Sequence, residues 1–283
     1  MKVVVFGATG MAGHVIAVHL RELGHDVLPV GGRTALEPDA PKVDVTHQQE
    51  LLEFLSAHAD ADIIVNCVGI LIEASENDPA LAAYANGYFP HLLEKATRDT
   101  TTRIVHLSTD CVFAGTRAPY RETDPYDGES FYDRSKALGE LKNSKDLTFR
   151  MSIIGPDLRA DGVGLFNWFM AQRGTIRGYT EAIWNGITTI ELARGIEAAM
   201  HQGLTGLYHL VPEGNISKFD LLNLMKAEFG RDDLVIEADH RPAPDKTLAN
   251  TRKDFDFSVS PYSQQIREMR QWIDMHREYY PHY

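Results

Sequence analysis

The sequence has few cysteines and no long apolar run. Only Cys67 and Cys111 occur among its 283 residues, and they form no CxxC pattern. This usage argues against a disulfide-rich scaffold or a cysteine zinc site, and it favours a reducing compartment. No stretch approaches the roughly 18 to 20 apolar residues that a membrane helix needs. We therefore expect a cytoplasmic protein with no membrane partner.

Positive charge is scarce as well. The chain has 28 Lys and Arg residues against 40 Asp and Glu residues, which gives a net charge of −12. Such an acidic chain lacks the electrostatic footprint of a protein that binds nucleic acid or anionic membranes. An anionic ligand would have to be held by backbone amides and a few local basic side chains.

Short apolar segments alternate with amphipathic segments along the first 155 residues. The segments that read as strands are 2–6, 25–30, 42–45, 61–68, 103–108 and 147–154. The segments that read as helices are 11–24, 48–58, 79–98 and 131–143. Apolar strands separated by helices are typical of a parallel sheet covered on both faces. We predict an α/β, doubly wound, Rossmann-type fold, in which ligands bind at the carboxyl ends of the strands.

The regular alternation loosens after Pro156. Further segments that read as helices are 165–174, 189–203, 217–230 and 262–280, and 206–211 reads as a strand. We expect residues 1–155 to form the Rossmann domain. Residues 156–283 should form a smaller C-terminal substrate-binding lobe, with some elements returning to the main sheet.

The first predicted strand runs directly into "GATGMAG", which joins it to the first predicted helix. The GxxGxxG spacing differs from the GxGxxG fingerprint, but glycines in this place equally permit a tight turn and a close approach to a pyrophosphate. The glycines could serve the turn alone, yet the strand–glycine–helix context favours a dinucleotide site. The predicted cofactor-binding residues of this loop are Gly7, Thr9, Gly10, Met11, Ala12 and Gly13.

The end of the second predicted strand bears on the choice of dinucleotide. An NAD site has an Asp or Glu about 20 residues past the glycines, where it binds the ribose hydroxyls. The candidate positions are Gly31 and Gly32, and Arg33 follows them. A missing carboxylate and a nearby guanidinium favour a 2′-phosphate, so we predict NADP(H) over NAD(H). Alternatively, Arg33 simply points to solvent.

Tyr132 and Lys136 are four residues apart in "FYDRSK", so on a helix their side chains leave the same face. A phenol has a pKa near 10, and an adjacent ammonium group would lower that pKa. Tyr132 could then act as a general acid toward a carbonyl oxygen. Such pairs are also common on solvated helix faces, so the rest of the chain has to decide.

Five motifs occur in the order found in the extended short-chain dehydrogenase/reductases. They are "GATGMAG", "VNCVG" (65–69), "LSTDCVFAG" (107–115), "PYRETD" (119–124) and "YDRSKALGE" (132–140). Together they look most like the dTDP-4-dehydrorhamnose reductase branch, and they cover most of the first 155 residues. The resemblance implies hydride transfer from a nicotinamide to a keto group, with the proton coming from Tyr132.

The same resemblance implies roles for further residues. Thr109 would be the hydroxyl that orients the reacting oxygen, and Lys136 would also bind the nicotinamide ribose. Asp110 would touch the sugar. Asn86 matches a helix asparagine that supports the active-site backbone, although it could equally be a polar face residue, and we count it with the substrate site. The implied contacts to adenine and ribose are Asp44, Val45, Cys67, Val68 and Gly69.

Three positions depart from related enzymes. Asp110 and Cys111 stand where sugar-nucleotide dehydratases have Asp and Glu, so elimination is not expected. In the related GDP-fucose synthases a cysteine at the position of Cys111 is an epimerisation base, but here no histidine lies between His106 and His201 to pair with it. A buried structural thiol is the favoured interpretation. Ile153 replaces a tryptophan common in dTDP-rhamnose enzymes, which leaves the sugar nucleotide open.

We predict an NADPH-dependent reductase of a nucleotide-activated 4-keto-6-deoxysugar, without a metal and allowing a homodimer. Trp184 and Asn185 are candidates for packing against the base or sugar, although Trp184 could instead fill the core of the lobe. One alternative is a sugar-nucleotide epimerase or epimerase-reductase. Another is an NADP-binding regulatory subunit resembling that of methionine adenosyltransferase, with the tail "REYYPHY" (277–283) as a docking segment.

Overall fold

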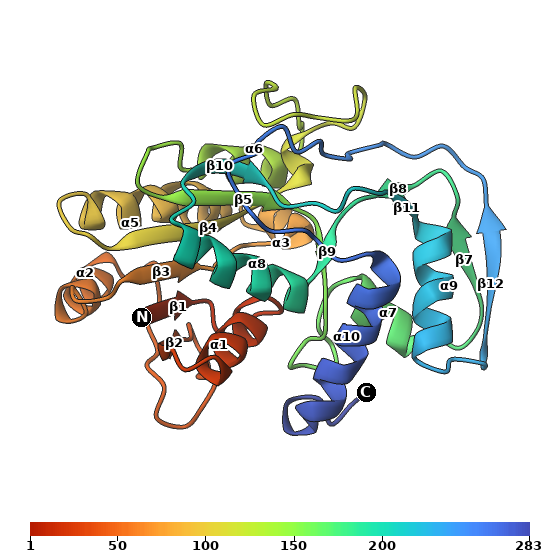
Figure 1. The fold of residues 1–283 in the computed structure, drawn as a ribbon, viewed down its shortest axis with the longest axis horizontal. Helices are drawn as coiled ribbons and strands as arrows, with labels where there is room; N and C mark the ends of the chain where they lie inside the picture. Colours follow the sequence, from red (N-terminus) through yellow and green to blue (C-terminus); the bar gives the residue numbers. More distant parts are fainter.

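The computed structural model describes residues 1–283 and has a central sheet of six parallel strands (Figure 1). Their spatial order is β10-β5-β4-β3-β1-β2. The strands are β1 (Lys2–Phe6), β2 (Asp26–Val30), β3 (Ile63–Asn66), β4 (Arg103–Thr109), β5 (Leu147–Met151) and β10 (Gly206–His209). This architecture confirms the predicted Rossmann-type α/β class.

Helices cover both faces of the sheet because its strands are apolar on both sides. Val3 and Val5 of β1 belong to the core beneath α1 (Gly13–Glu22) and α8 (Thr189–Gln202). Val4 and Phe6 belong to a second core beneath α2 (Gln48–Ala57) and α5 (Phe89–Thr97). The alternation follows from the two-residue period of a strand.

Two segments differ from the predicted elements. Residues 42–45 form no strand, and only an isolated bridge joins Lys42 to Gly31. The expected helix 79–98 divides into α4 (Pro79–Ala82), a π-helical turn η1 (Ala83–Tyr88) and α5.

The helix predicted over 131–143 is shorter than expected, since α6 (Phe131–Leu138) ends before Gly139. A Cβ at Gly139 would lie 1.9 Å from the Asn86 carbonyl oxygen. This close approach accounts for the glycine at the helix end. Before α6 come α3 (Ile72–Asn77) and the short 3-10 turn η2 (Asp110–Val112).

The second half of the chain contributes both to the main sheet and to a separate group of elements (Figure 1). Ser217 caps α9 (Lys218–Glu228), since its hydroxyl accepts a hydrogen bond from the Asp220 amide. Strand β10 is the edge of the main sheet, and α8 packs against α1. The separate group comprises α7 (Leu165–Ala171), β7 (Gly174–Tyr179), β8 (Ile183–Trp184), β11 (Ile216–Ser217), α9 (Lys218–Glu228), β12 (Leu234–Asp239) and α10 (Tyr262–Met275). Between the two groups, β6 (Ile153–Ile154) pairs with β9 (Ile187–Thr188).

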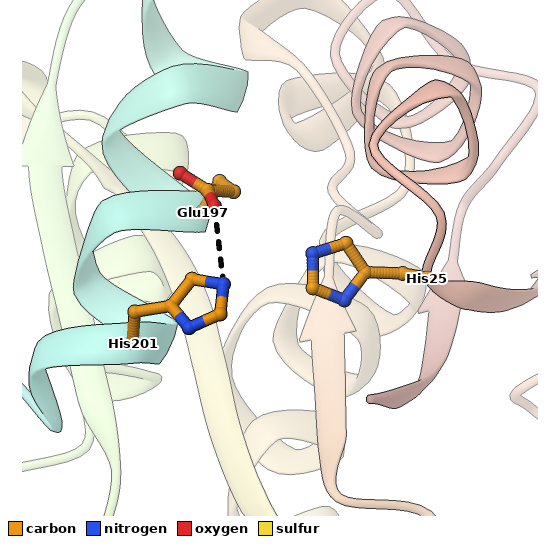
Figure 2. A group of neighbouring side chains, drawn as sticks. All are labelled: His25, Glu197 and His201. Carbon is orange, nitrogen blue, oxygen red and sulfur yellow. Dashed lines mark ion pairs between the residues drawn. The ribbon is translucent and has the colours of Figure 1, made fainter.

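The turn before β2 approaches α8 closely. It brings His25 next to Glu197 and His201 of that helix (Figure 2). These side chains lie outside the region predicted for catalysis, because His25 precedes β2 rather than following it.

The aromatic tail packs onto its own chain. Tyr280 is fully buried, and its hydroxyl lies 2.7 Å from His14 Nε2 and accepts a hydrogen bond from Trp272 Nε1 at 2.9 Å. The Tyr283 hydroxyl accepts a hydrogen bond from the Asp157 amide. These contacts bind the tail to its own chain.

None of the helices has the length and apolar character needed to cross a membrane.

Candidate active site

The loop between β1 and α1 packs so tightly that two of its glycines have no room for a side chain. Gly7 has a φ of +75°, and a Cβ there would lie 2.9 Å from the Cys67 carbonyl carbon. A Cβ on Gly13 would lie 2.1 Å from the Gly7 oxygen. The loop ends at the N-terminus of α1, where backbone amides can hold the negative charge of a pyrophosphate. The remaining predicted contacts of this loop are Thr9, Gly10, Met11 and Ala12.

The predicted adenosine contacts lie after β2, next to the glycine loop. Asp44 Oδ1 accepts hydrogen bonds from the Thr46 hydroxyl at 2.7 Å and from the Thr46 amide at 3.0 Å, and these bonds lower the pKa of Asp44. The exposed Arg33 is close enough for its charge to lower that pKa further. Val45 is half-buried beside them. This arrangement leaves a guanidinium available to a phosphate.

The segment Cys67, Val68 and Gly69 follows β3, on the other side of the glycine loop. The Cys67 amide donates a hydrogen bond to Phe6 O at 3.0 Å, and the Val68 amide donates to Asn66 Oδ1 at 3.1 Å. Burial raises the pKa of the Cys67 thiol to about 12, so the thiol stays protonated at neutral pH. The segment therefore offers shape and backbone rather than charge.

Thr109 and Tyr132 come from different elements and meet at the end of β4. Thr109 is the last residue of β4, and Tyr132 lies in the first turn of α6. The Ser130 hydroxyl caps that helix by accepting a hydrogen bond from the Asp133 amide, and the Asp133 carboxylate accepts one from the Ser130 amide. This capping box fixes the start of α6, which carries Tyr132 and Lys136 on one face.

Burial dominates the protonation of this pair. It raises the pKa of Tyr132, and the nearby Cys111 thiol raises it further, whereas the Thr109 side chain opposes the shift. Burial lowers the pKa of Lys136 to about 8. The expected lowering of the Tyr132 pKa by Lys136 is therefore wrong for this structure, because the Lys136 ammonium donates to Leu107 O at 2.7 Å and desolvation is the larger effect. Tyr132 remains protonated, as a proton donor must be.

Asn86 supports the backbone after β3 instead of facing a substrate. Its amide oxygen accepts from the Ile70 amide at 2.8 Å, and its amide nitrogen donates to Ile70 O and to Ser135 Oγ, both at 3.0 Å. The side chain is fully buried, and these bonds use both amide protons. These bonds agree with the backbone-supporting role that the resemblance implied for Asn86, and they leave neither amide proton free for a substrate.

Trp184 and Asn185 are likewise engaged inside the protein. Trp184 Nε1 donates to Ser152 Oγ at 2.8 Å, and the residue is 5 % exposed. The Asn185 amide nitrogen donates to Leu248 O at 2.7 Å, and its oxygen accepts from the Leu248 amide at 3.1 Å. Asn185 therefore holds the loop around Leu248, while Trp184 fills the core of the lobe, which is the alternative that the sequence left open for it.

Two lysines that the sequence did not single out flank Asp110. The Lys218 ammonium lies 4.6 Å from the centroid of the Trp184 ring. Burial raises the pKa of Asp110, while the charges of Lys218 and Lys246 act in the opposite direction. Burial also lowers the pKa of Lys218 to about 8. No local pattern marks these lysines, because both are far from Asp110 along the chain.

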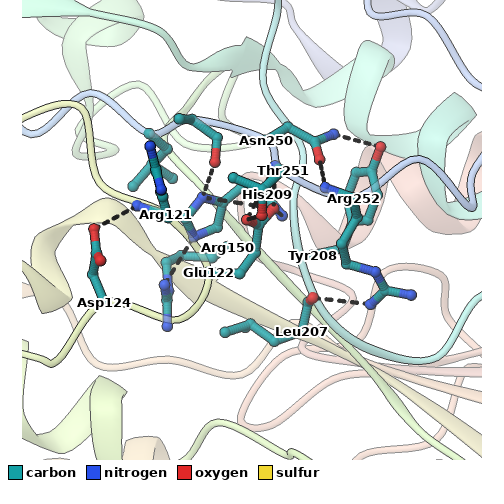
Figure 3. A network of polar contacts seen from close by, with 12 residues as sticks. Arg121, Glu122, Asp124, Arg150, Leu207, Tyr208, His209, Asn250, Thr251 and Arg252 are labelled. Atoms are coloured by element: carbon teal, nitrogen blue, oxygen red, sulfur yellow. Dashed lines mark hydrogen bonds and ion pairs between the residues drawn. The ribbon is translucent and has the colours of Figure 1, made fainter.

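A polar network around the buried Arg150 and His209 includes Glu122 of the sequence motif 119–124 (Figure 3). Arg150 of β5 is fully buried and donates to both oxygens of Glu140, at 2.9 and 2.7 Å. Its other terminal nitrogen lies 2.8 Å from His209 Nε2. Glu122 accepts hydrogen bonds from the amide and hydroxyl of Thr251. Glu140 therefore binds Arg150 of β5, and Glu122 connects His209 of β10 to the loop at Thr251.

The sequence matches the family of the RmlD substrate binding domain over residues 1–254. The chain belongs to this family. That finding confirms the resemblance to the dTDP-4-dehydrorhamnose reductases, which the five sequence motifs indicated.

Several curated relatives have names of reductases. The chain is 28 % identical over 268 residues to the probable low-salt glycan biosynthesis reductase Agl14 of Haloferax volcanii, covering 89 % of this chain and 88 % of that one. It is 28 % identical to the dTDP-4-keto-6-deoxy-D-glucose reductase of Streptomyces niveus, covering 87 % and 83 %. It is also 28 % identical to the dTDP-4-dehydrorhamnose reductase of Salmonella typhimurium, covering 80 % and 77 %.

Solved structures share the fold. The dTDP-4-dehydrorhamnose reductase of Bacillus anthracis in complex with NADP superposes with a TM-score of 0.82 at 19 % identity, covering 96 % of this chain and all (100 %) of that one. A UDP-N-acetylglucosamine 4-epimerase of Methanobrevibacter ruminantium gives 0.78 at 17 % identity, covering 97 % and 98 %. The fold alone therefore does not separate reductase from epimerase.

Proposed function

We propose that this chain is an NADPH-dependent reductase of a nucleotide-activated 4-keto-6-deoxysugar. The observation that carries the proposal is the contact between Thr109 and the protonated Tyr132 at the carboxyl end of β4, in a chain of the RmlD family. The names of its relatives as dTDP-4-dehydrorhamnose and dTDP-4-keto-6-deoxyglucose reductases support the substrate class. The two free cysteines fit a site of action in the reducing cytoplasm.

The residues present fit NADP(H). The glycine loop packs closely enough, at Gly7 and Gly13, to bring its backbone amides and the N-terminus of α1 to a pyrophosphate. The exposed Arg33 can pair with a 2′-phosphate. When bound, this cofactor supplies the hydride. Lys136 would hold the nicotinamide ribose close to Tyr132.

Tyr132 and Thr109 act on the oxygen of the keto group in this proposal. The Thr109 hydroxyl donates a hydrogen bond that orients the oxygen. The Tyr132 phenol then gives its proton to that oxygen as negative charge develops there. The high pKa of the phenol keeps the proton in place until the oxygen becomes basic enough to take it.

We further propose that the lobe formed by residues 156–283 contributes cationic groups to substrate binding. Lys218 and Lys246 flank Asp110 next to the end of β4. A sugar nucleotide carries a diphosphate, and two ammonium groups in one half-buried place would neutralise it. They supply locally the positive charge that the acidic chain lacks as a whole.

The proposal is tested by incubating the protein with NADPH and dTDP-, UDP- and GDP-linked 4-keto-6-deoxysugars while following nicotinamide absorbance. We expect oxidation with one nucleotide series. Tyr132→Phe should lower kcat by about 10²- to 10⁴-fold, because it removes the proton donor. The exposed Tyr88→Phe is the matched control and should keep wild-type kcat.

The epimerase alternative predicts a different outcome, in which NADPH remains on the protein and the sugar changes configuration without net oxidation. Burial raises the pKa of the Cys111 thiol to about 12, which makes it a poor base at neutral pH. This shift favours the reductase. The buried Tyr280 likewise argues against a docking role for the tail in a regulatory subunit.

A further inference from the structure

A cluster of three potential metal ligands lies at the opposite edge of the sheet from the candidate active site (Figure 2). Glu197 and His201 are one turn apart on α8, and His25 lies just before β2. Each residue can offer one ligand atom, and these atoms all lie within 4.8 Å of one another. Segments far apart in the sequence thus converge at one point.

An ordinary ion pair explains only part of this cluster. His201 Nε2 lies 3.1 Å from Glu197 Oε1, which is a common contact at this helical spacing. His25 has no such explanation, because its Nδ1 atom is buried without a hydrogen-bond partner. A buried polar atom without a partner is costly, and a ligand or a water has to satisfy it.

The chemistry of the set suits zinc. Two imidazoles and one carboxylate are ligands that Zn²⁺ accepts, with solvent in the remaining position. Zinc bonds of about 2.0–2.2 Å require ligand atoms somewhat closer than 4.8 Å, so a small rotation of the side chains is needed.

We propose that His25, Glu197 and His201 bind one Zn²⁺ ion that clamps the start of β2 to α8. The ion would stabilise the fold and take no part in hydride transfer. The reason is geometric: His25 precedes β2, whereas the candidate catalytic and cofactor residues follow the carboxyl ends of the strands. The clamp joins a helix from the second half of the chain to the nucleotide-binding half.

The test uses the full chain, freed of metal with a chelator and dialysed. Zinc chloride is titrated by calorimetry, and thermal unfolding is recorded with and without zinc. We expect one zinc per chain and a rise in Tm of several degrees at saturating zinc. His25→Asn and His201→Asn should each weaken zinc binding at least tenfold and abolish the rise.

His47→Asn is the matched control. His47 and Glu50 form an exposed helical pair at 3.4 Å, similar to His201 and Glu197 but without a third ligand. This variant should bind zinc as the wild type does. The proposal fails if wild-type Tm and heat do not respond to zinc, if either ligand variant keeps the full response, or if the control loses it equally.

Discussion

At the scale of single residues, Tyr132 and Lys136 show how burial acts on protons. The pKa of the phenol rises and that of the ammonium falls to about 8, since both neutral forms avoid the cost of a buried charge. The helical spacing of the pair is visible in the sequence. The direction of the Tyr132 shift is not, because it depends on how many atoms surround the ring.

Arg33 offers a residue-scale prediction on cofactor choice. Arg33→Ala should raise the KM for NADPH strongly, by about tenfold or more, and leave the KM for NADH nearly unchanged. The reason is that a guanidinium pairs with a 2′-phosphate, which NADH lacks. Steady-state kinetics with both cofactors measures the ratio. Equal effects on the two cofactors would remove Arg33 from the cofactor site.

Lys218 carries a prediction on substrate binding. Lys218→Met should raise the KM for the nucleotide sugar about tenfold while leaving kcat within a few-fold, because the lysine would bind the diphosphate rather than the reacting oxygen. Lys253→Met, which changes an exposed lysine, is the control and should keep the wild-type KM. A KM that is unchanged in the Lys218 variant would contradict the proposed cationic subsite.

At the scale of elements, the π-helical turn η1 interrupts the helix predicted over 79–98. A π turn adds a residue to a helical turn and is frequent at functional sites. Asn86 lies in this turn and reaches both Ile70 and Ser135. The amphipathic pattern of 79–98 predicts a helix but contains no sign of the turn, because hydrophobic periodicity changes little over one added residue.

The glycine loop gives an element-scale prediction. Gly13→Ala should greatly weaken NADPH binding, by about a hundredfold, because its Cβ would lie 2.1 Å from the Gly7 oxygen and force the loop apart from α1. Fluorescence titration with NADPH measures the effect. Gly214→Ala is the control, since a Cβ there meets nothing within 4 Å and Gly214 lies outside the predicted cofactor residues. If both variants bind NADPH equally well, the glycine loop is not the cofactor-binding site.

At the scale of the whole molecule, a hydrogen-bonded chain links the C-terminal tail to the glycine loop. Trp272 donates to the Tyr280 hydroxyl, which lies 2.7 Å from His14 Nε2. His14 Nδ1 lies 2.8 Å from the Gly10 carbonyl oxygen, which can only accept. The imidazole therefore has one protonated nitrogen and one acceptor, and burial lowers its pKa to about 4.

Buried histidines predict acid sensitivity. The folded pKa values of His14 and His209 are both about 4, below the ordinary 6.5, so the unfolded chain binds these protons first. The free energy of unfolding should fall as pH drops from 6.5 toward 4, by on the order of 3 kcal/mol per histidine. Urea unfolding across this range measures the slope.

Variants of His14 and His209 test whether these two residues, rather than other titratable groups, cause the acid sensitivity. His14→Gln and His209→Gln should each make the loss of stability with acid shallower, whatever they do to stability at neutral pH. The exposed His47→Gln should leave the slope unchanged. A wild-type slope in both buried-site variants would show that other groups control the acid response.

The sequence by itself determined the Rossmann-type class, the glycine loop and the placement of Tyr132 and Lys136 on one helical turn. These features depend on periodicity and on residues close together in the chain, so a local pattern contains them. The segment 42–45 shows the limit of such patterns, since its apolar alternation forms only one bridge.

Only the tertiary structure decided which polar groups are free to meet a ligand. Asn86 and Asn185 hydrogen-bond to the backbones of distant loops, whereas Lys218 approaches Asp110 from the other half of the chain. The same holds for His25 beside α8. Such contacts join residues far apart in sequence, and their geometry arises only when the elements pack against one another.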